Sequence, residues 1–186
     1  MSKTRIIGKE RPSAPPEPQK AVPPDADEPI MEAIELLFFG YRDFVSDPDV
    51  ILTSYEFGRA HHRVVHFVGR NPGITVAELL SILLITKQSL ARVLRQLIER
   101  GFIEQKTGEK DRRQRRLYLT AAGLDLWRRL LEPQHRRVRR AFAAAGPNAE
   151  RAWRDVLLAL LDEEHRPEVE HVIAKDASPE GTKDRK

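Results

Sequence analysis

The chain has 186 residues, of which 40% are hydrophobic and 32% are charged, with a formal net charge of +4 and no cysteine. This length and hydrophobic content suit one compact domain with tails, and the lack of cysteine excludes disulfides, thiolate metal sites and sensing by thiol oxidation. No apolar run approaches the roughly 18 residues of a membrane span, and the N-terminus lacks the apolar core of a signal peptide. We therefore expect a cytoplasmic protein with no membrane partner.

Positive charge is concentrated in one part of the chain. Residues 86–140 hold 16 Lys or Arg and 6 Asp or Glu, whereas the whole chain has 32 and 28. A local excess of this kind is the usual electrostatic footprint of a surface that binds phosphate groups. The composition therefore favours a nucleic-acid partner.

Both ends of the chain are predicted to be tails. Residues 1–28 hold six of the 13 prolines, few large apolar residues and equal numbers of basic and acidic side chains, which predicts a disordered arm. This arm either has no role or places cations against DNA, and the candidates are Lys3, Arg5, Lys9 and Arg11. Residues 175–186 are polar and are predicted to be a flexible tail.

Two helices are predicted after the arm. Apolar residues at helical spacing predict the first over Pro29–Val45, and Asp47-Pro48 should end it because proline disfavours the helical conformation of the residue before it. A capping box from Thr53 to Glu56 predicts that the second helix starts there and runs to about Gly69. The second helix contains three histidines, His61, His62 and His66.

A helix-turn-helix and a hairpin are predicted in the basic region. A capping box at Thr75 opens a short helix, and Thr86 caps the next one, which stops at Gly101. The second of these helices has one apolar stripe, made of Leu90, Val93, Leu94, Leu97 and Ile98, and an opposite polar face. Residues 102–107 and 115–120 then alternate as two short strands around a polar tip. This is the order of a winged helix-turn-helix.

Two longer helices are predicted after the hairpin, over 121–142 and 149–165, with Gly146-Pro147 at the corner between them. The last helix carries a continuous apolar stripe that includes Trp153, Leu157 and Leu160. This stripe needs a partner surface.

The basic region resembles the MarR family of bacterial transcription regulators. Residues 86–123 are similar to the recognition helix, wing and wing exit of that family, which has an Asp-x-Arg followed by Leu-Thr-x-x-Gly. Here Asp111-Arg112-Arg113 and Leu119-Thr120-Ala121-Ala122-Gly123 keep the spacing of eight residues from the Asp to the Leu. The similarity extends from about Glu32 to Glu164.

The resemblance implies a mainly α fold with a small β-hairpin, in which a winged helix-turn-helix head stands on a helical dimerisation stem. The expected parts are a dimerisation helix over 29–52, the DNA-binding domain over 53–120 and C-terminal dimerisation helices over 121–168. The protein is then expected to be a homodimer that binds a pseudopalindromic operator in double-stranded DNA. The residues expected at the dimer interface are Ile34, Phe38, Trp153, Leu157 and Leu160.

The expected DNA contacts follow from the chemistry of each side chain. Gln88 suits an adenine edge and Arg92 a guanine edge, whereas Lys87 and Thr86 are better placed for phosphates. The resemblance places Arg113 in a minor groove, with Asp111 holding the wing tip. The full expected set is Thr86, Lys87, Gln88, Ser89, Arg92, Arg95, Lys110, Asp111, Arg112, Arg113 and Arg115.

The resemblance also implies a small-molecule effector, bound between stem and head, that releases or tunes the regulator. Aromatic walls with cationic groups suit an aromatic or amphipathic anion, and the expected set is Phe38, Tyr41, Arg42, Arg59, His62 and His66. In this interpretation Arg59 or Arg42 pairs with the ligand, and His62 or His66 titrates near neutrality.

Catalysis is not predicted, since no nucleophile elbow, phosphate loop or metalloprotease motif is present. No cofactor is expected in the main interpretation. Two alternatives to an effector-released repressor stay open. One is a haem- or metal-responsive regulator that uses His61, His62 and His66. The other is an architectural DNA-binding protein without an effector.

Overall fold

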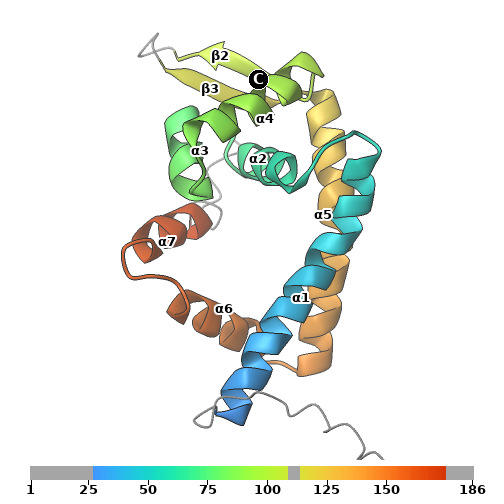
Figure 1. Cartoon of the computed structure of the whole chain (residues 1–186), viewed down its shortest axis with the longest axis vertical. Coiled ribbons are helices and arrows are strands. Elements are labelled where there is room, and N and C mark those ends of the chain that lie inside the picture. The colour runs from blue at the N-terminus through green and yellow to red at the C-terminus, as the bar shows by residue number, and fades with distance from the viewer. Residues whose placement is uncertain (1–26, 109–113, 175–186) are drawn as a thin grey trace, which may run out of the picture. The chain divides into compact units, whose positions relative to one another are not determined.

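The computed structural model of the protein describes residues 27–108 and 114–174 (Figure 1). Within these residues lie helices α1 to α7 and strands β1 to β3. The chain divides into two units, one ending at Phe39 and the next starting at Gly40, so helix α1 (Glu28–Thr53) begins in the first and ends in the second. None of the helices in the described ranges is long and apolar enough to cross a membrane.

Helix α1 continues through Pro48, so the predicted end at Asp47-Pro48 was wrong. A proline inside a helix lacks the N–H that would bond the carbonyl four residues earlier. Here that carbonyl, on Phe44, accepts a hydrogen bond from Gln134 Nε2 at 3.5 Å instead, and Pro48 is buried. Gln134 is itself buried on helix α5 (Ala121–Ala145). A donor from a distant helix thus replaces the bond that the proline cannot make.

Helix α2 spans Arg59–Arg70, so the predicted capping box of Thr53 and Glu56 was also wrong. Thr53 belongs to α1, where its hydroxyl donates to a carbonyl of the preceding turn, and Glu56 adopts a left-handed conformation with φ of 53°. The helix is capped by Gly58, whose N–H donates to His61 Nδ1 at 3.1 Å. A histidine therefore takes the role that the sequence suggested for a glutamate.

The helix-turn-helix forms as predicted from α3 (Val76–Leu83) and α4 (Lys87–Glu99). Thr75 and Glu78 make the predicted capping box at the start of α3. In the turn between the helices, Leu84 adopts the left-handed conformation with φ of 48°. The two helix starts were thus predictable from short local motifs.

A three-stranded antiparallel sheet forms the wing. Strands β1 (Ile74–Thr75), β2 (Ile103–Thr107) and β3 (Arg115–Leu119) lie in the order β1-β3-β2. Strands β2 and β3 agree with the predicted hairpin to within one residue, whereas β1 was missed because two residues show no alternation. In the register, Ile74 lies opposite Leu117. The fold is mainly helical with a small sheet, as predicted.

The C-terminal part differs from the prediction. Helix α5 has the predicted start, but the helix expected over 149–165 is shorter and appears as α6 (Ala149–Ala159), followed by α7 (Arg166–Ala174). The Asp162 carbonyl accepts the N–H groups of His165 and Arg166 at 3.0 and 3.1 Å, which starts α7 after a turn. Figure 1 shows the two helices joined by this turn.

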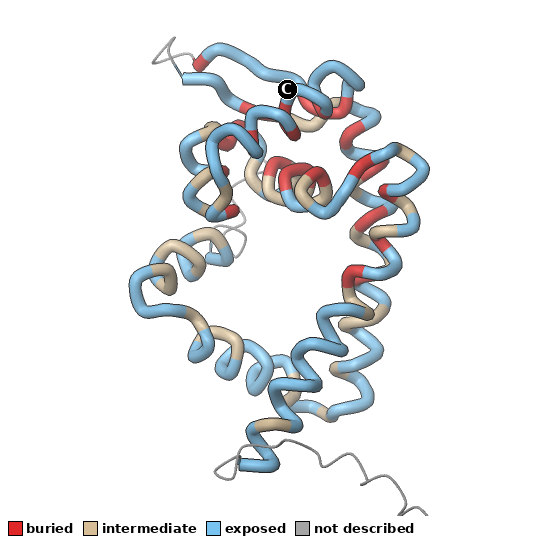
Figure 2. The backbone as a smooth tube through the Cα atoms, in the orientation of Figure 1, coloured by how far each residue is buried: buried red, intermediate tan, exposed pale blue. Residues whose placement is uncertain are grey.

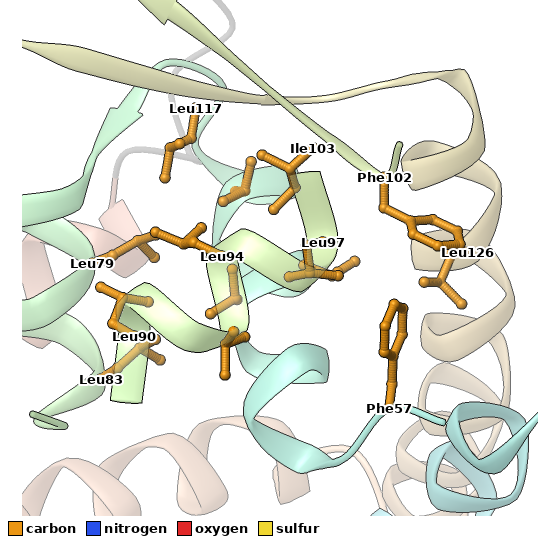
Figure 3. Packing of buried hydrophobic residues seen from close by; sticks show 14 of the residues in the cluster. Phe57, Leu79, Leu83, Leu90, Leu94, Leu97, Phe102, Ile103, Leu117 and Leu126 are labelled. Atoms are coloured by element: carbon orange, nitrogen blue, oxygen red, sulfur yellow. The ribbon is translucent and has the colours of Figure 1, made fainter. Parts of the chain in front are cut away.

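The core lies where α2, α3, α4 and the sheet meet the first half of α5, and Figure 2 shows most buried positions gathered there. Figure 3 shows Leu90, Leu94 and Leu97 of α4 pointing into this cluster, with Phe57 and Phe102 beside Leu126. The predicted stripe of α4 is buried except for Ile98, which is exposed. The core therefore holds α4 by one face only.

Candidate nucleic-acid interface

The face of α4 opposite the core is polar and exposed. Thr86, Lys87, Gln88, Ser89, Arg92 and Arg95 all lie on it, as the sequence predicted for the DNA-reading helix. Because the buried face anchors the helix in the core, these side chains project from a rigid element. They are the residue types that reach base edges and phosphates from the first turns of a recognition helix.

The start of α4 is fixed by its own side chains. Thr86 Oγ1 accepts the Ser89 N–H at 3.2 Å and donates its hydroxyl proton to Ser89 Oγ at 2.9 Å. This arrangement satisfies one of the N–H groups that a helix start leaves unpaired. Because Ser89 Oγ accepts the bond from Thr86, its own hydroxyl group can still donate to another acceptor.

A contact that the sequence did not suggest supports the C-terminal half of α4. His61 is buried, its ring stacks on Phe57 with centroids 4.5 Å apart, and its Nε2 lies 2.7 Å from Gln96 Oε1. Because Nδ1 accepts the Gly58 N–H, Nε2 carries the proton and donates to Gln96. No sequence signal links His61 and Gln96, which are 35 positions apart.

The wing is described only at its base. Lys110, Asp111, Arg112 and Arg113 lie outside the described residues. At the base, the Gly108 N–H donates to the Gln114 carbonyl at 2.9 Å, and exposed Arg115 on β3 donates to Thr107 Oγ1 at 3.3 Å. Strands β2 and β3 therefore hold the two ends of the tip together.

The Leu-Thr-x-x-Gly motif joins the wing to α5. Thr120 Oγ1 donates to the Gly101 carbonyl at 2.6 Å and accepts the Gly123 N–H at 3.1 Å, so it caps α5 and closes the wing at once. A Cβ atom on Gly123 would lie 2.0 Å from the Phe102 carbonyl oxygen. The motif therefore needs glycine at Gly123 for close packing of two backbones.

The predicted effector residues fall in two groups. Phe38 belongs to the first unit, and the remaining residues, Tyr41, Arg42, Arg59, His62 and His66, belong to the second. Both arginines already have carboxylate partners. Arg59 donates through Nε and Nη2 to Asp49 at 3.0 and 2.8 Å, and Arg42 donates to Asp43 at 2.8 Å. A ligand anion must compete with these partners.

The expectation that His62 or His66 titrates near neutrality was wrong for His66. Burial, the largest cause, and the nearby groups His62, Arg70 and His135 together lower the pKa of His66 to about 4. Burial also lowers the pKa of His62, against an opposing effect of Asp49. His66 is therefore neutral at pH 7, because the protonated form of this partly buried imidazole loses hydration.

The three histidines do not form one ligand set. Both ring nitrogens of His61 are used by Gly58 and Gln96, whereas His66 lies beside Trp127 and Phe67 with ring centroids 6.4 and 5.2 Å away. In residues 27–108 and 114–174, no group of three or more His, Asp or Glu side chains is placed to hold a metal ion. The metal-responsive alternative therefore gains no support from this geometry.

Comparison with known proteins agrees with this arrangement. The family model described as MarR family matches residues 55–114. The chain is 51% identical over 136 residues to the HTH-type transcriptional regulator PetP of Rhodobacter capsulatus, and the match covers 73% of this chain and 82% of that protein. The chain belongs to the MarR family.

Solved structures of MarR-family proteins share the fold. The MarR protein from Peptoclostridium difficile matches with a TM-score of 0.62 at 18% identity, over 80% of this chain and 95% of that chain. The MarR family transcription regulator SP03579 matches with a TM-score of 0.59 at 20% identity, over 71% of this chain and 87% of that chain. Membership of the MarR family makes this chain a transcriptional regulator with a helix-turn-helix, and the expectation of a regulator rather than an enzyme is confirmed.

Proposed function

We propose that the protein is a homodimeric repressor that binds a pseudopalindromic operator through α4 and the wing, and that a small aromatic or amphipathic anion releases or tunes it. The observation that carries this proposal is the exposed polar face of α4, held by a buried face of four aliphatic side chains. A rigid helix that presents Gln88 and Arg92 in its first two turns suits base reading in a major groove.

In this proposal the side chains of α4 have separate roles. Arg92 pairs with a guanine and Gln88 with an adenine, while Thr86, Lys87, Ser89 and Arg95 contact the backbone or neighbouring bases. The wing cations Lys110, Arg112, Arg113 and Arg115 add phosphate and minor-groove contacts, with Asp111 ordering the tip. Base contacts specify the site and phosphate contacts set the register.

Exposed apolar side chains on two helices support the homodimer. Phe38 on α1 is 69% exposed, Trp153 on α6 is 54% exposed, and Leu160, which follows the last residue of α6, is 62% exposed. Ile34 is also exposed and Leu157 is half-buried. No residue of α6 is buried, so its amphipathic stripe covers little surface within one chain. Large exposed apolar side chains of this kind usually mark an interface.

The effector proposal centres on Arg59. Its guanidinium is held by Asp49 in an exposed two-bond pair, and His62 lies close enough to Asp49 for the carboxylate to act on its pKa. A ligand carboxylate that displaces Asp49 takes over both hydrogen bonds, and Tyr41 and His62, which belong to the same unit, supply aromatic surface. Competition with Asp49 makes the effector bind weakly and makes release graded.

The DNA-reading role is tested by Arg92→Ala on a duplex identified by genomic footprinting. We expect a loss of about 1 to 3 kcal/mol on this duplex, relaxed preference at one base step and little change on random DNA. Arg139→Ala, which removes an equal charge from an exposed position of α5, is the matched control. An equal loss on both DNAs assigns Arg92 to a phosphate, and no preference in the parent protein points to an architectural protein.

The dimer is tested by sedimentation at micromolar concentration. We expect the parent protein and Arg151→Glu, a charge change at an exposed polar position of α6, to sediment as dimers. Leu160→Glu should shift the equilibrium towards monomer, because it places a charge inside the proposed apolar interface. A monomeric parent protein would contradict the architecture.

The effector site is tested by calorimetry with a panel of aromatic acids and with haem. Asp49→Asn should strengthen binding of an aromatic acid, since it removes the competing carboxylate, and Arg59→Ala should abolish it. Haem binding that is lost in His62→Ala, with no aromatic acid bound, would overturn the anion proposal in favour of the haem-responsive alternative.

A further inference from the structure

Tyr55 lies in the short connection between α1 and α2, and its side chain packs on the core. The ring lies 6.0 Å from that of Phe57 in a stacked arrangement and 5.6 Å from that of Phe102 in an edge-to-face arrangement. Tyr55 is half-buried, although the residues on either side of it are exposed. Aromatic contacts on two sides hold it in a defined position.

The end of the recognition helix binds the backbone of Tyr55. Arg100 follows the last residue of α4, and its Nη1 donates to the Tyr55 carbonyl. The same guanidinium lies over the Phe57 ring, 4.7 Å from its centroid. A charged hydrogen bond and a cation–π contact therefore attach the C-terminal end of α4 to this connection.

The long helix α5 binds the side chain of the same residue. Arg129 Nη1 donates to the Tyr55 hydroxyl oxygen, and its guanidinium carbon lies 5.6 Å from the ring centroid. Arg100 and Arg129 thus reach Tyr55 from two helices and use different atoms of it. Tyr55 is a bridge between the recognition helix and the helix that carries the head.

This bridge can control DNA binding because α4 is long. A small tilt at one end of the helix moves the other end by more than the distance over which a hydrogen bond holds. Gln88 lies twelve positions before Arg100, which is roughly 18 Å along the helix at 1.5 Å per residue. A tilt of about 10° around the Arg100 end displaces Gln88 by roughly 3 Å, whereas hydrogen bonds to bases fail within a fraction of that distance. Small freedom at one end of α4 therefore disrupts contacts at the other.

We propose that Tyr55 is a positioning residue for DNA binding, which fixes the angle of α4 to α5 through its bonds with Arg100 and Arg129. This inference rests on the proposed reading of bases by α4. Tyr55 touches no DNA in this account, and it acts through the orientation of Gln88 and Arg92. A residue that only packs the core affects stability, whereas a positioning residue affects specific affinity at unchanged stability.

The test separates these two roles with substitutions that keep the aromatic packing. Tyr55→Phe removes the hydroxyl that Arg129 binds but keeps the ring and the carbonyl that Arg100 binds. Arg129→Met removes the other partner, and Arg128→Met removes the same charge from the adjacent, exposed position of α5. Affinity is measured on the footprinted duplex and on random DNA, together with thermal unfolding of each protein.

We expect Tyr55→Phe and Arg129→Met each to weaken binding to the footprinted duplex about five- to tenfold, and the double variant to be no weaker than either. Binding to random DNA, the unfolding temperature and the Arg128→Met variant should change little. The inference would be overturned if Tyr55→Phe bound the footprinted duplex as tightly as the parent. It would also be overturned if the effects of the two substitutions multiplied in the double variant, or if the loss of affinity in each variant followed a fall in its unfolding temperature.

A second measurement reads the orientation directly, and the lack of native cysteine makes it simple. A spin label on Gln105→Cys, an exposed position of β2, reports the distance between the heads of a dimer. Tyr55→Phe should broaden the distribution of this distance, and Arg128→Met should leave it as in the parent. An unchanged distribution in Tyr55→Phe would contradict the positioning role. If the parent and Arg92→Ala both bind the footprinted duplex no more tightly than random DNA, the result contradicts the proposed function and not the positioning role of Tyr55.

Discussion

Partly buried His66 makes the protein sensitive to mild acid, and the size of the effect follows from its surroundings. The imidazole packs beside Phe67 and Trp127, with His62, Arg70 and His135 close enough to act on its charge. Burial, the largest cause, and these three neighbours lower its pKa from 6.5 to about 4 in the folded protein. Below pH 6.5 the unfolded chain therefore binds a proton that the folded chain excludes until about pH 4.

The stability linked to His66 is fully present above pH 6.5 and is lost as the pH falls towards 4. One pKa unit corresponds to about 1.4 kcal/mol, so the full window represents roughly 3 kcal/mol in the free energy of unfolding. About 2 kcal/mol of this should be lost between pH 7.5 and 5, before most carboxylates titrate.

The assay is urea unfolding at pH 7.5 and 5, at one fixed protomer concentration because dimerisation would add to the apparent stability. At pH 7.5 we expect His66→Phe to unfold at the same urea concentration as the parent or at a higher one. Between pH 7.5 and 5 its free energy of unfolding should fall by about 2 kcal/mol less than that of the parent. Equal losses in the two proteins would refute the burial argument for His66.

Three further substitutions test local features of the DNA-binding domain: a close backbone contact, a left-handed turn residue and a helix cap. Gly123→Ala should cost at least about 3 kcal/mol of folding free energy, measured by urea unfolding, because a Cβ atom would meet the Phe102 carbonyl oxygen; a stable variant would show that the backbones can separate. Leu84→Gly should stabilise the protein by about 0.5 to 1 kcal/mol, since Leu84 is exposed and left-handed; a lower unfolding temperature would contradict this. Thr86→Ala should cost about 1 kcal/mol and weaken DNA binding by loosening the start of α4; unchanged stability and affinity would remove the cap from the account.

The parts that the sequence predicted well are those with local causes. The helix starts at Thr75 and Thr86 depend on side chains within three residues, and the hairpin depends on alternation over about five. The exposed residues of α4 follow from the period of the helix once the apolar stripe is known. The fold class and family could therefore be predicted from short stretches of the chain.

The errors have tertiary causes. Pro48 remains helical because buried Gln134, 90 positions away from Phe44 in the chain, donates to the Phe44 carbonyl. The pattern of Thr53 and Glu56 has the form of a capping box, but α2 starts later, where Gly58 is the cap and its N–H donates to His61. The low pKa of His66 depends on the surroundings of a packed α2, which sequence spacing does not give.

The candidate site shows the same division. The polar face of α4 was predicted from residue types. The contacts of Gln96 with His61 and of Arg100 with Tyr55 were not predicted. The pairing of Arg59 with Asp49 was also missed, because it joins α2 to the preceding helix through an exposed carboxylate. Contacts between elements thus carry the information that a pattern along one element lacks.

The most direct test of the central claim is selection of bound duplexes from a pool of random DNA, followed by sequencing. A homodimer that reads bases with two copies of α4 predicts an enriched inverted repeat, with half-site centres roughly one helical turn, or about 10 base pairs, apart. Enrichment should disappear or change at one symmetric base step with Arg92→Ala. A pool that shows no enriched sequence, or only single half-sites without symmetry, would contradict the account.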